Sequence, residues 1–190
     1  MSKIFRPATG SVSKDGNSTE TGLISPSRRA FGVAAAASAL TLAACGGSGA
    51  YRGPRVTSVV VNKSARRMYL LHYSDILTEY DVDLGFAPQG HKLHEGDGRT
   101  PEGTYLIDRR NPRSKFHLSV GISYPNAQDR ALAAALGKRP GGDIFIHGEP
   151  NNEKPPKKRD WTAGCIAVTN KEIEEIYQMV QVGTVITLRA

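Results

Sequence analysis

The chain has 190 residues, of which 39% are apolar, and it carries a formal net charge of +7. This length suits one domain with additional segments, and the apolar content is enough for one modest core. The basic excess is mild and no nucleic-acid motif accompanies it, so we expect no nucleic-acid partner. The charge suits contact with anionic polymers or lipid headgroups, or it reflects scattered lysines on a soluble domain.

The first 44 residues predict a targeting segment. Residues 1–24 are polar and lack apolar periodicity, so we expect them to be disordered. The stretch Ser27-Arg28-Arg29-Ala30-Phe31 resembles a twin-arginine export signal, and the alanine-rich run 32–44 behind it is too short to span a bilayer. A charged region followed by a short apolar region and small residues is typical of a signal peptide.

The end of this run, Leu42-Ala43-Ala44-Cys45, resembles a lipobox, in which the chain is cut before a cysteine that carries lipid. Several acyl chains on one residue anchor firmly, whereas one chain is marginal. We expect an exported protein on the periplasmic side, anchored through Cys45, and Gly46 favours the outer membrane of a Gram-negative cell. The alternative is an ordinary signal peptide with an incidental Cys45. Residues 45–54, rich in Gly and Ser, predict a flexible tether.

Residues 55–190 predict a mostly-β domain with two short helices. Short β-branched or alternating runs indicate strands at 56–61, 67–71, 80–84, 104–107, 116–120, 144–146 and 182–188. An alanine-rich stretch at 129–136 predicts a short helix that stops at Gly137. A second helix is expected from an N-cap at Asn170 through Val180. Its apolar face comprises Ile173, Ile176, Tyr177 and Val180.

Two glycine-flanked segments carry the candidate reactive side chains. Residues 144–148 end in His147-Gly148, and residues 160–168 contain Gly164-Cys165. A thiol attacks a carbonyl as the thiolate, and a neighbouring histidine can hold its proton. Loops at the ends of packed strands can bring Cys165 and His147 together, with backbone N–H groups near Gly164 and Cys165 forming an oxyanion hole.

Cys165 and His147 are also compatible with purely structural roles. A lone cysteine is usually a small buried apolar side chain, and a histidine on an apolar strand more often belongs to the core. His91 and His94 are the candidate metal ligands, but no acidic or cysteine ligand set with suitable spacing accompanies them. We therefore expect no metal site. With only two cysteines in the chain, a disulfide-held fold is not expected either.

Residues 144–168 resemble the signature of the L,D-transpeptidase catalytic domain, the YkuD-type fold. That signature is a His-Gly, a variable loop, then Ser/Thr-x-Gly-Cys and a hydrophobic residue. It is matched by His147, Gly148, Thr162, Gly164, Cys165 and Ile166. The resemblance continues upstream through 90–92, 96–103 and 122–126, and so spans about 55–190. It implies a β-sandwich or barrel-like domain with a groove over the cysteine, and no metal or organic cofactor.

The resemblance also implies roles for individual residues. Cys165 would attack the amide before the terminal D-alanine of a peptidoglycan stem peptide and form a thioacyl-enzyme. His147 would take the thiol proton and return it to the leaving amine, with the Gly148 carbonyl orienting its imidazole. Gly164, Thr162 and Trp161 are the expected substrate-binding or oxyanion residues. Trp161 is expected either to line the groove or to belong to the core.

The chain departs from the usual signature at two positions. Many members have His and Arg where this chain has Ala163 and Ala167, so recognition of the substrate is expected to differ. The string Asp-Trp-Thr-Ala-Gly-Cys-Ile-Ala instead resembles a subgroup with both cross-linking enzymes and hydrolases that release lipoprotein from peptidoglycan. The basic loop 149–159 predicts either a solvated segment or a lid whose charges meet substrate carboxylates.

Three functions follow as hypotheses. The first is an L,D-transpeptidase that cross-links the wall or attaches protein to it. The second is a hydrolase or amidase on the same scaffold that releases peptidoglycan-linked lipoprotein or trims stem peptides. The third is a non-catalytic peptidoglycan-binding lipoprotein, which the intact Cys165 and His147 argue against. The expected partners are stem peptides, a wall-linked lipoprotein and, through the lipid anchor, a membrane, and we expect a monomer.

Overall fold

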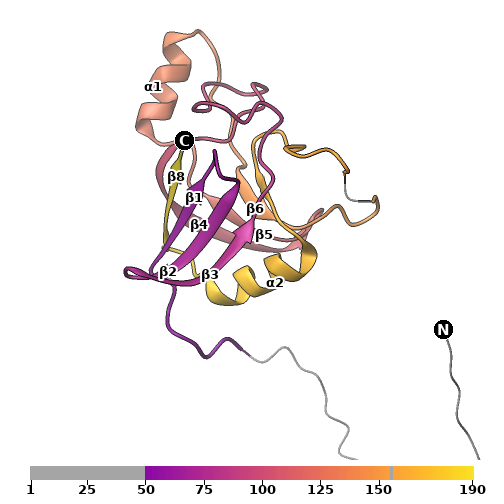
Figure 1. Ribbon diagram of the computed structural model, residues 1–190. Coiled ribbons are helices and arrows are strands. Elements are labelled where there is room, and N and C mark those ends of the chain that lie inside the picture. Colours follow the sequence, from indigo (N-terminus) through magenta and orange to yellow (C-terminus); the bar gives the residue numbers. More distant parts are fainter. Residues whose placement is uncertain (1–49, 155) are drawn as a thin grey trace, which may run out of the picture. The chain divides into compact units, whose positions relative to one another are not determined.

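The computed structural model describes residues 50–154 and 156–190, so the predicted export signal, the lipobox and most of the tether lie outside the described residues. The described part is mostly β with two short helices, which confirms the predicted fold class (Figure 1). Its elements are β1 (Ser58–Asn62), β2 (Arg67–His72), β3 (Asp75–Asp81), β4 (Gly103–Ser114), β5 (His117–Ile122), α1 (Ala127–Ala135), β6 (Phe145–His147), β7 (Ile166–Ala167), α2 (Asn170–Met179) and β8 (Val185–Arg189).

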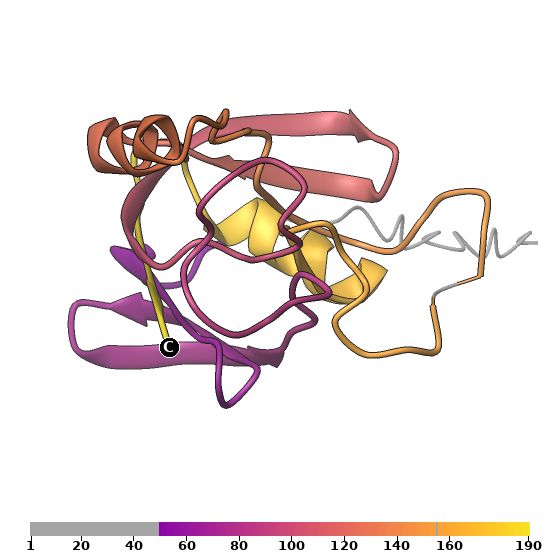
Figure 2. The same cartoon turned by 90° about the horizontal axis from the view of Figure 1, so that it is seen from above.

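These strands form one sheet in the order β3-β2-β1-β8-β4-β5-β6-β7. The long strand β4 joins its two halves, because residues 103–106 pair with β8 and residues 107–114 pair with β5. Seen from above, β1 to β3 and the β4–β5 hairpin form two layers, and α2 lies between them in this view (Figure 2). The helix packs on β5 and β6, which places the candidate site segments at its N-terminal end.

The core follows from the alternation of side chains along the strands. Val59 and Val61 in β1 are fully buried, as are Met68 and Leu70 in β2, whereas their neighbours in sequence are half-buried. The predicted apolar face of α2 meets the same core. Ile173, Ile176 and Val180 are fully buried there, and Tyr177 packs against them.

The predicted N-cap of α2 is wrong by one residue. Thr169 is the cap: its hydroxyl accepts from the Glu172 N–H at 3.3 Å, and the Glu172 carboxylate accepts from the Thr169 N–H at 2.8 Å. Both residue types suit the reciprocal capping arrangement. The Asn170 side chain instead accepts from the N–H of Glu149 at 2.9 Å. The helix start is thereby tied to the segment that follows His147.

The strand predicted at 80–84 is displaced. The observed strand, β3, ends at Asp81, and the chain continues extended with Val82 and Leu84 buried, which explains the alternating pattern. Asp83 pairs with Ala167 of β7 through two backbone hydrogen bonds of 2.9 and 2.8 Å. The predicted stop of α1 is confirmed, because Gly137 follows the helix with a φ of +65°.

Candidate active site

His147 ends β6 and is buried, with 3% of its surface exposed. Its Nδ1 lies 2.7 Å from the carbonyl oxygen of Gly148. Because a carbonyl oxygen only accepts, Nδ1 carries the proton and Nε2 keeps its lone pair. Burial lowers the pKa of His147, although the Gly148 carbonyl opposes this effect. The imidazole is therefore neutral near pH 7, the state that a general base requires.

The backbone after His147 is tightly held. The Gly148 N–H donates to the carbonyl oxygens of Phe116 at 3.0 Å and Leu118 at 3.3 Å. A Cβ at position 148 would lie 2.6 Å from Oδ1 of Asn170, so only glycine fits without displacing the start of α2. The carbonyl that orients the imidazole is thus fixed by the fold.

Cys165 directly precedes β7 and is half-buried. Its Sγ donates to the carbonyl oxygen of Asp143 at 3.5 Å, which places the sulfur beside the segment that leads into β6. Burial raises the pKa of the Cys165 thiol, although the Phe145 N–H opposes this by hydrogen bonding to the sulfur. The thiol is protonated near pH 7 and needs a base to become nucleophilic.

The strand register brings these two residues onto one face. β6 and β7 are parallel, with Ile146 opposite Ile166 and His147 opposite Ala167. Side chains alternate along each strand, so His147, one residue after Ile146, and Cys165, one residue before Ile166, project to the same side of adjacent strands. The register therefore places the two residues singled out in the sequence on the same side of adjacent strands.

Thr162 holds the turn that leads into Cys165. Its buried hydroxyl donates to the Cys165 carbonyl at 2.8 Å and accepts from the Gly164 N–H at 3.1 Å. The Gly164 N–H is therefore already used within the turn, which differs from its expected role in an oxyanion hole. Thr162 acts on the position of Cys165 through the backbone, and it was expected to contact substrate.

Gly164→Ala is expected to lower both stability and reactivity. Gly164 has a φ of +137°, and a Cβ there would lie 2.7 Å from the carbonyl oxygen of Arg99. The backbone must shift next to the nucleophile, at a cost of about 1–3 kcal/mol in the free energy of unfolding. Denaturant unfolding and the rate of thiol acylation measure the two effects. Gly183→Ala is the matched control, because Gly183 also has a positive φ, +89°, but open space around it; equal acylation losses in both variants contradict the prediction.

An aromatic cluster surrounds the imidazole. The Phe116 ring lies 4.5 Å from the His147 ring, and Trp161 meets it edge-on at 5.6 Å, measured between centroids. Trp161 is half-buried, lies outside the buried core cluster and lines a cavity. Phe116 was missed as a site residue, because its only sequence signal was membership of a short apolar strand.

Asp160 anchors the segment that carries Trp161, a role that no local sequence pattern indicates. Its carboxylate accepts two hydrogen bonds from Nε and one from Nη2 of Arg66, the shortest at 2.7 Å, and one from the Leu84 N–H at 3.0 Å. Burial opposes its ionisation, but these donors outweigh it and hold the pKa of Asp160 below its usual value. The approach to Cys165 is therefore tied to the loop after β1.

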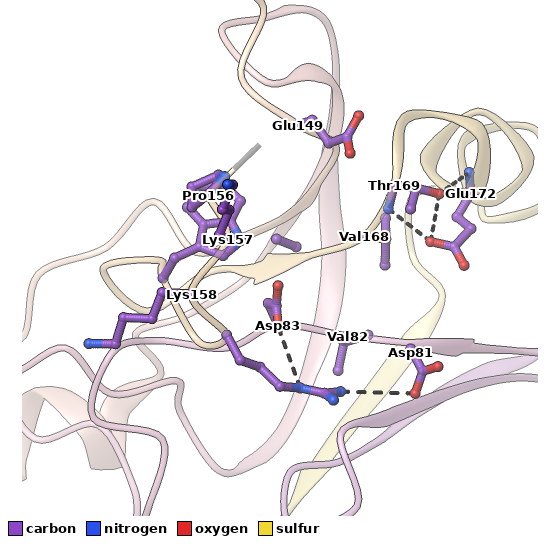
Figure 3. A pocket seen from close by; sticks show the side chains of 13 residues that line it. Asp81, Val82, Asp83, Glu149, Pro156, Lys157, Lys158, Val168, Thr169 and Glu172 are labelled. Atoms are coloured by element: carbon purple, nitrogen blue, oxygen red, sulfur yellow. Dashed lines mark hydrogen bonds and ion pairs between the residues drawn. The ribbon is translucent and has the colours of Figure 1, made fainter. Parts of the chain in front are cut away.

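Two cavities flank the pair, each of about 480 Å³. The first, here the thiol-side cavity, is lined by Lys92, Glu95, Gly96, Arg139, Pro140, Gly141, Gly142, Asp143, Ile144, Ala163 and Cys165. The second, the loop-side cavity, is lined by Asp81, Val82, Asp83, Glu149, Pro156, Lys157, Lys158, Arg159, Trp161, Ala167, Val168, Thr169 and Glu172 (Figure 3). The two departures from the usual signature each line one cavity. Ala163 lines the thiol-side cavity, and Ala167 lines the loop-side cavity.

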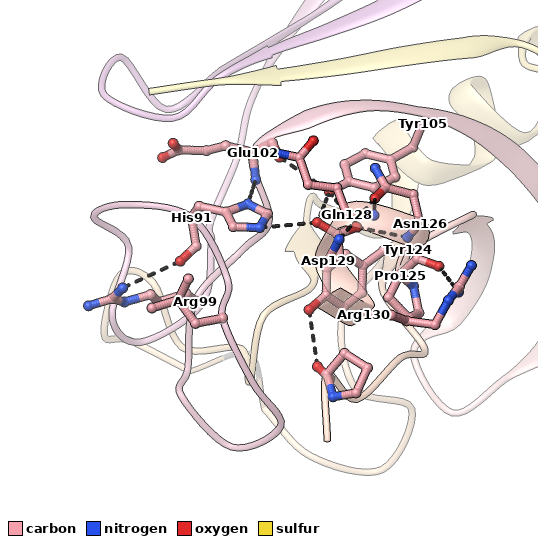
Figure 4. Close-up of polar contacts among 12 residues, drawn as sticks. His91, Arg99, Glu102, Tyr105, Tyr124, Pro125, Asn126, Gln128, Asp129 and Arg130 are labelled. Carbon is pink, nitrogen blue, oxygen red and sulfur yellow. Dashed lines mark hydrogen bonds and ion pairs between the residues drawn. The ribbon is translucent and has the colours of Figure 1, made fainter. Parts of the chain in front are cut away.

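His91 belongs to a buried polar cluster at the start of α1 (Figure 4). Its Nδ1 accepts from the Glu102 N–H at 3.0 Å, so its Nε2 carries a proton and points to Asp129 at 3.1 Å. Asp129, 3% exposed, also accepts from the Tyr105 hydroxyl and from the Asn126 N–H. Both ring nitrogens of His91 are thus engaged, and they tie its loop to Glu102 and to the first turn of α1.

A mostly-β domain with this Cys-His arrangement is an L,D-transpeptidase-type domain by fold. The family model for the L,D-transpeptidase catalytic domain (YkuD) matches residues 57–188, and the chain belongs to that family. A relative, the putative L,D-transpeptidase YafK of Escherichia coli K12, is 34% identical over 107 residues, which are 55% of this chain and 37% of YafK.

Solved structures show the same fold. The helical cell shape determining protein Pgp2 from Campylobacter jejuni is 28% identical with a TM-score of 0.56, over 73% of this chain and 49% of Pgp2. Bd1075 of Bdellovibrio bacteriovorus is 25% identical with a TM-score of 0.50, over 72% of this chain and 48% of Bd1075. The chain thus covers less than half of the length of each relative named here.

Acylation of the thiol is expected to slow as the pH falls through the pKa of His147, because a protonated imidazole cannot accept the thiol proton. Burial holds this pKa below the ordinary value of 6.5, so the rate at pH 6.5 should exceed half of its plateau value. The rate of covalent labelling by a carbapenem, followed by mass spectrometry across the acid range, measures the midpoint. A midpoint above 6.5 contradicts the assignment of a buried neutral base.

Proposed function

We propose that the protein is an L,D-transpeptidase that acts on peptidoglycan stem peptides through a thioacyl-enzyme on Cys165. The supporting observation is the oriented, neutral His147 on the strand adjacent to Cys165. Its Nδ1 donates to the Gly148 carbonyl at 2.7 Å, so Nε2 keeps a lone pair that can accept the thiol proton. Family membership supports the same chemistry.

In the first half-reaction, Sγ of Cys165 attacks the carbonyl carbon of the amide before the terminal D-alanine. The thiol proton passes to Nε2 of His147, and the C–N bond breaks as this proton is returned to the leaving amine. We assign the stabilisation of the developing oxyanion to the N–H of Cys165, because the Gly164 N–H already donates to Thr162. The product is a thioester on Cys165 and free D-alanine.

In the second half-reaction, an amine from another stem peptide or a protein lysine attacks the thioester and restores the thiol. The alternative is a hydrolase, in which water takes the acyl group and a stem peptide or a linked lipoprotein is released. Ala163 and Ala167 support this alternative, because the segment around them resembles that of a subgroup with both activities. The two candidates share Cys165 and His147 and differ only in the acceptor.

The test is product analysis on a tetrapeptide donor with and without a primary amine. The proposal predicts release of D-alanine in both cases and an amide product when the amine is present. Release without any amide product assigns the hydrolase, and no release contradicts both. In cells, loss of 3–3 cross-links on gene deletion supports the transpeptidase, whereas excess wall-bound lipoprotein supports the hydrolase.

We further propose that residues 1–44 direct export, that Cys45 is lipidated, and that residues 45–54 tether the catalytic domain, 55–190, on the periplasmic side of a membrane. The lipobox pattern supports this proposal. Among residues 50–154 and 156–190, no helix is long and apolar enough to cross a bilayer. The proposal fails if Cys45→Ser leaves membrane association unchanged.

A further inference from the structure

Glu149 is the acidic residue of the loop-side cavity whose charge is unmatched. Arg159 lies 3.6 Å from Asp83 and 4.0 Å from Asp81, and the Glu172 carboxylate binds the N–H and hydroxyl of Thr169 (Figure 3). For Glu149, no ion pair or side-chain hydrogen bond is found within 50–154 and 156–190, although the residue is half-buried. Lys157 and Lys158 also line this cavity, but both are exposed, whereas Glu149 is half-buried. A half-buried carboxylate without a partner favours a cationic ligand.

The position of Glu149 is fixed relative to the imidazole. It lies two residues after His147, and its N–H donates to the Asn170 side chain at 2.9 Å. The N–H of Gly148, the preceding residue, donates to the carbonyl oxygens of Phe116 and Leu118. The Glu149 carboxylate is therefore presented from a backbone that also orients the proposed base.

The loop-side cavity lies beside residues that neighbour the His147 imidazole. Cys165 lines the thiol-side cavity, whereas Trp161, which meets the His147 ring edge-on, and Ala167, the register partner of His147, line the loop-side cavity. His147 exchanges protons with the leaving amine and, by microscopic reversibility, with the incoming one. On the proposed mechanism, the acyl part of the donor is assigned to the thiol-side cavity and the amines to the loop-side cavity.

We propose that Glu149 binds the ammonium group of the acceptor, a primary amine such as the side chain of a diamino acid or a lysine, and so favours aminolysis over hydrolysis. This inference rests on the proposed thioacyl-enzyme. Glu149 is a specificity residue for the acceptor, because the thiol can be acylated without it.

The proton balance of this step is simple. The bound ammonium loses one proton to solvent and becomes a free amine. Its nitrogen attacks the thioester carbonyl, the C–S bond breaks, and the second proton passes through Nε2 of His147 to Sγ of Cys165. The thioester and the ammonium thus give an amide, a thiol and one released proton, with no further reactant.

The test compares Glu149→Gln with Glu153→Gln, a matched control on the exposed part of the same loop. A tetrapeptide is the donor, and two acceptors are used: Nα-acetyl-lysine amide, which is cationic, and hydroxylamine, which is uncharged at neutral pH. We expect Glu149→Gln to raise the KM for the lysine acceptor and to lower the ratio of its amide product to hydrolysis by about tenfold. Hydroxylamine transfer and hydrolysis should stay unchanged, and Glu149→Asp should keep part of the preference.

Equal ratios in the two glutamine variants overturn the proposal, as does an equal loss with both acceptors, since charge recognition predicts a loss for the cation alone. Hydrolysis without lysine transfer in the unmodified protein overturns it as well. Carbapenem labelling of Cys165 separates these results from failure of the proposed function. If Cys165 is labelled, the thioacyl chemistry is supported and only the assignment of the acceptor is contradicted. If Cys165 is not labelled, the proposed function itself is wrong.

Discussion

Cys165→Ala is expected to abolish release of D-alanine from a tetrapeptide donor, with a loss of about 10⁴-fold or more. Without Sγ no thioester forms, and the buried imidazole of His147 has no thiol proton to accept. The side chain is small and half-buried, so the free energy of unfolding should change by less than about 1 kcal/mol. Donor turnover and denaturant unfolding, measured on the same preparation, separate lost chemistry from lost fold. Residual turnover above a few per cent contradicts the nucleophile assignment.

His147→Gln is expected to slow acylation of Cys165 by about 10²–10⁴-fold near pH 7. The amide of glutamine can still donate to the Gly148 carbonyl but cannot take the thiol proton. Because burial raises the pKa of Cys165, few thiolates form without a base. The measurement is the rate of carbapenem labelling as a function of pH.

The loss in His147→Gln should shrink at alkaline pH, where the thiol ionises unaided. A purely structural role for His147 predicts a loss that does not depend on pH. His72→Gln is the matched control, because His72 lies at the end of β2 and its ring Nδ1 is 2.8 Å from the carbonyl oxygen of Arg55. A pH-independent deficit, or an equal deficit in the control, contradicts the role of base.

The sequence was informative where the signal is local. The alternation of β1 and β2, the apolar face of α2 and the glycine stop of α1 each depend on neighbouring residues, and all are observed. The paired segments around His147 and Cys165 are also short, and a parallel pairing of two strands suffices to bring them onto one face.

The supporting contacts were not predictable, because they join residues far apart in the chain. Arg66 binds Asp160 across 94 positions, and the Thr162 N–H pairs with the Leu84 carbonyl. The strand β4 also runs to Ser114 through Pro112, a residue that usually marks a turn. Its register shifts between Asn111 and Ser114, which accommodates the proline. Such tertiary effects override local propensity.

The two departures from the usual signature lie in the walls of the two cavities. Ala163 and Ala167 replace larger polar side chains and line the thiol-side and the loop-side cavity respectively. Small residues at both positions leave room beside the proposed nucleophile. On the proposal above, recognition of the acceptor then depends on charged residues such as Glu149, which lines the loop-side cavity.

The central claim is that Cys165 is a nucleophile activated by His147. Its most direct test is to incubate the protein with a carbapenem and to weigh the intact chain and its peptides. We predict one covalent adduct, located on the peptide that contains Cys165, and none on Cys165→Ala. Absence of an adduct on the unmodified protein, or an adduct that persists in the alanine variant, contradicts this claim.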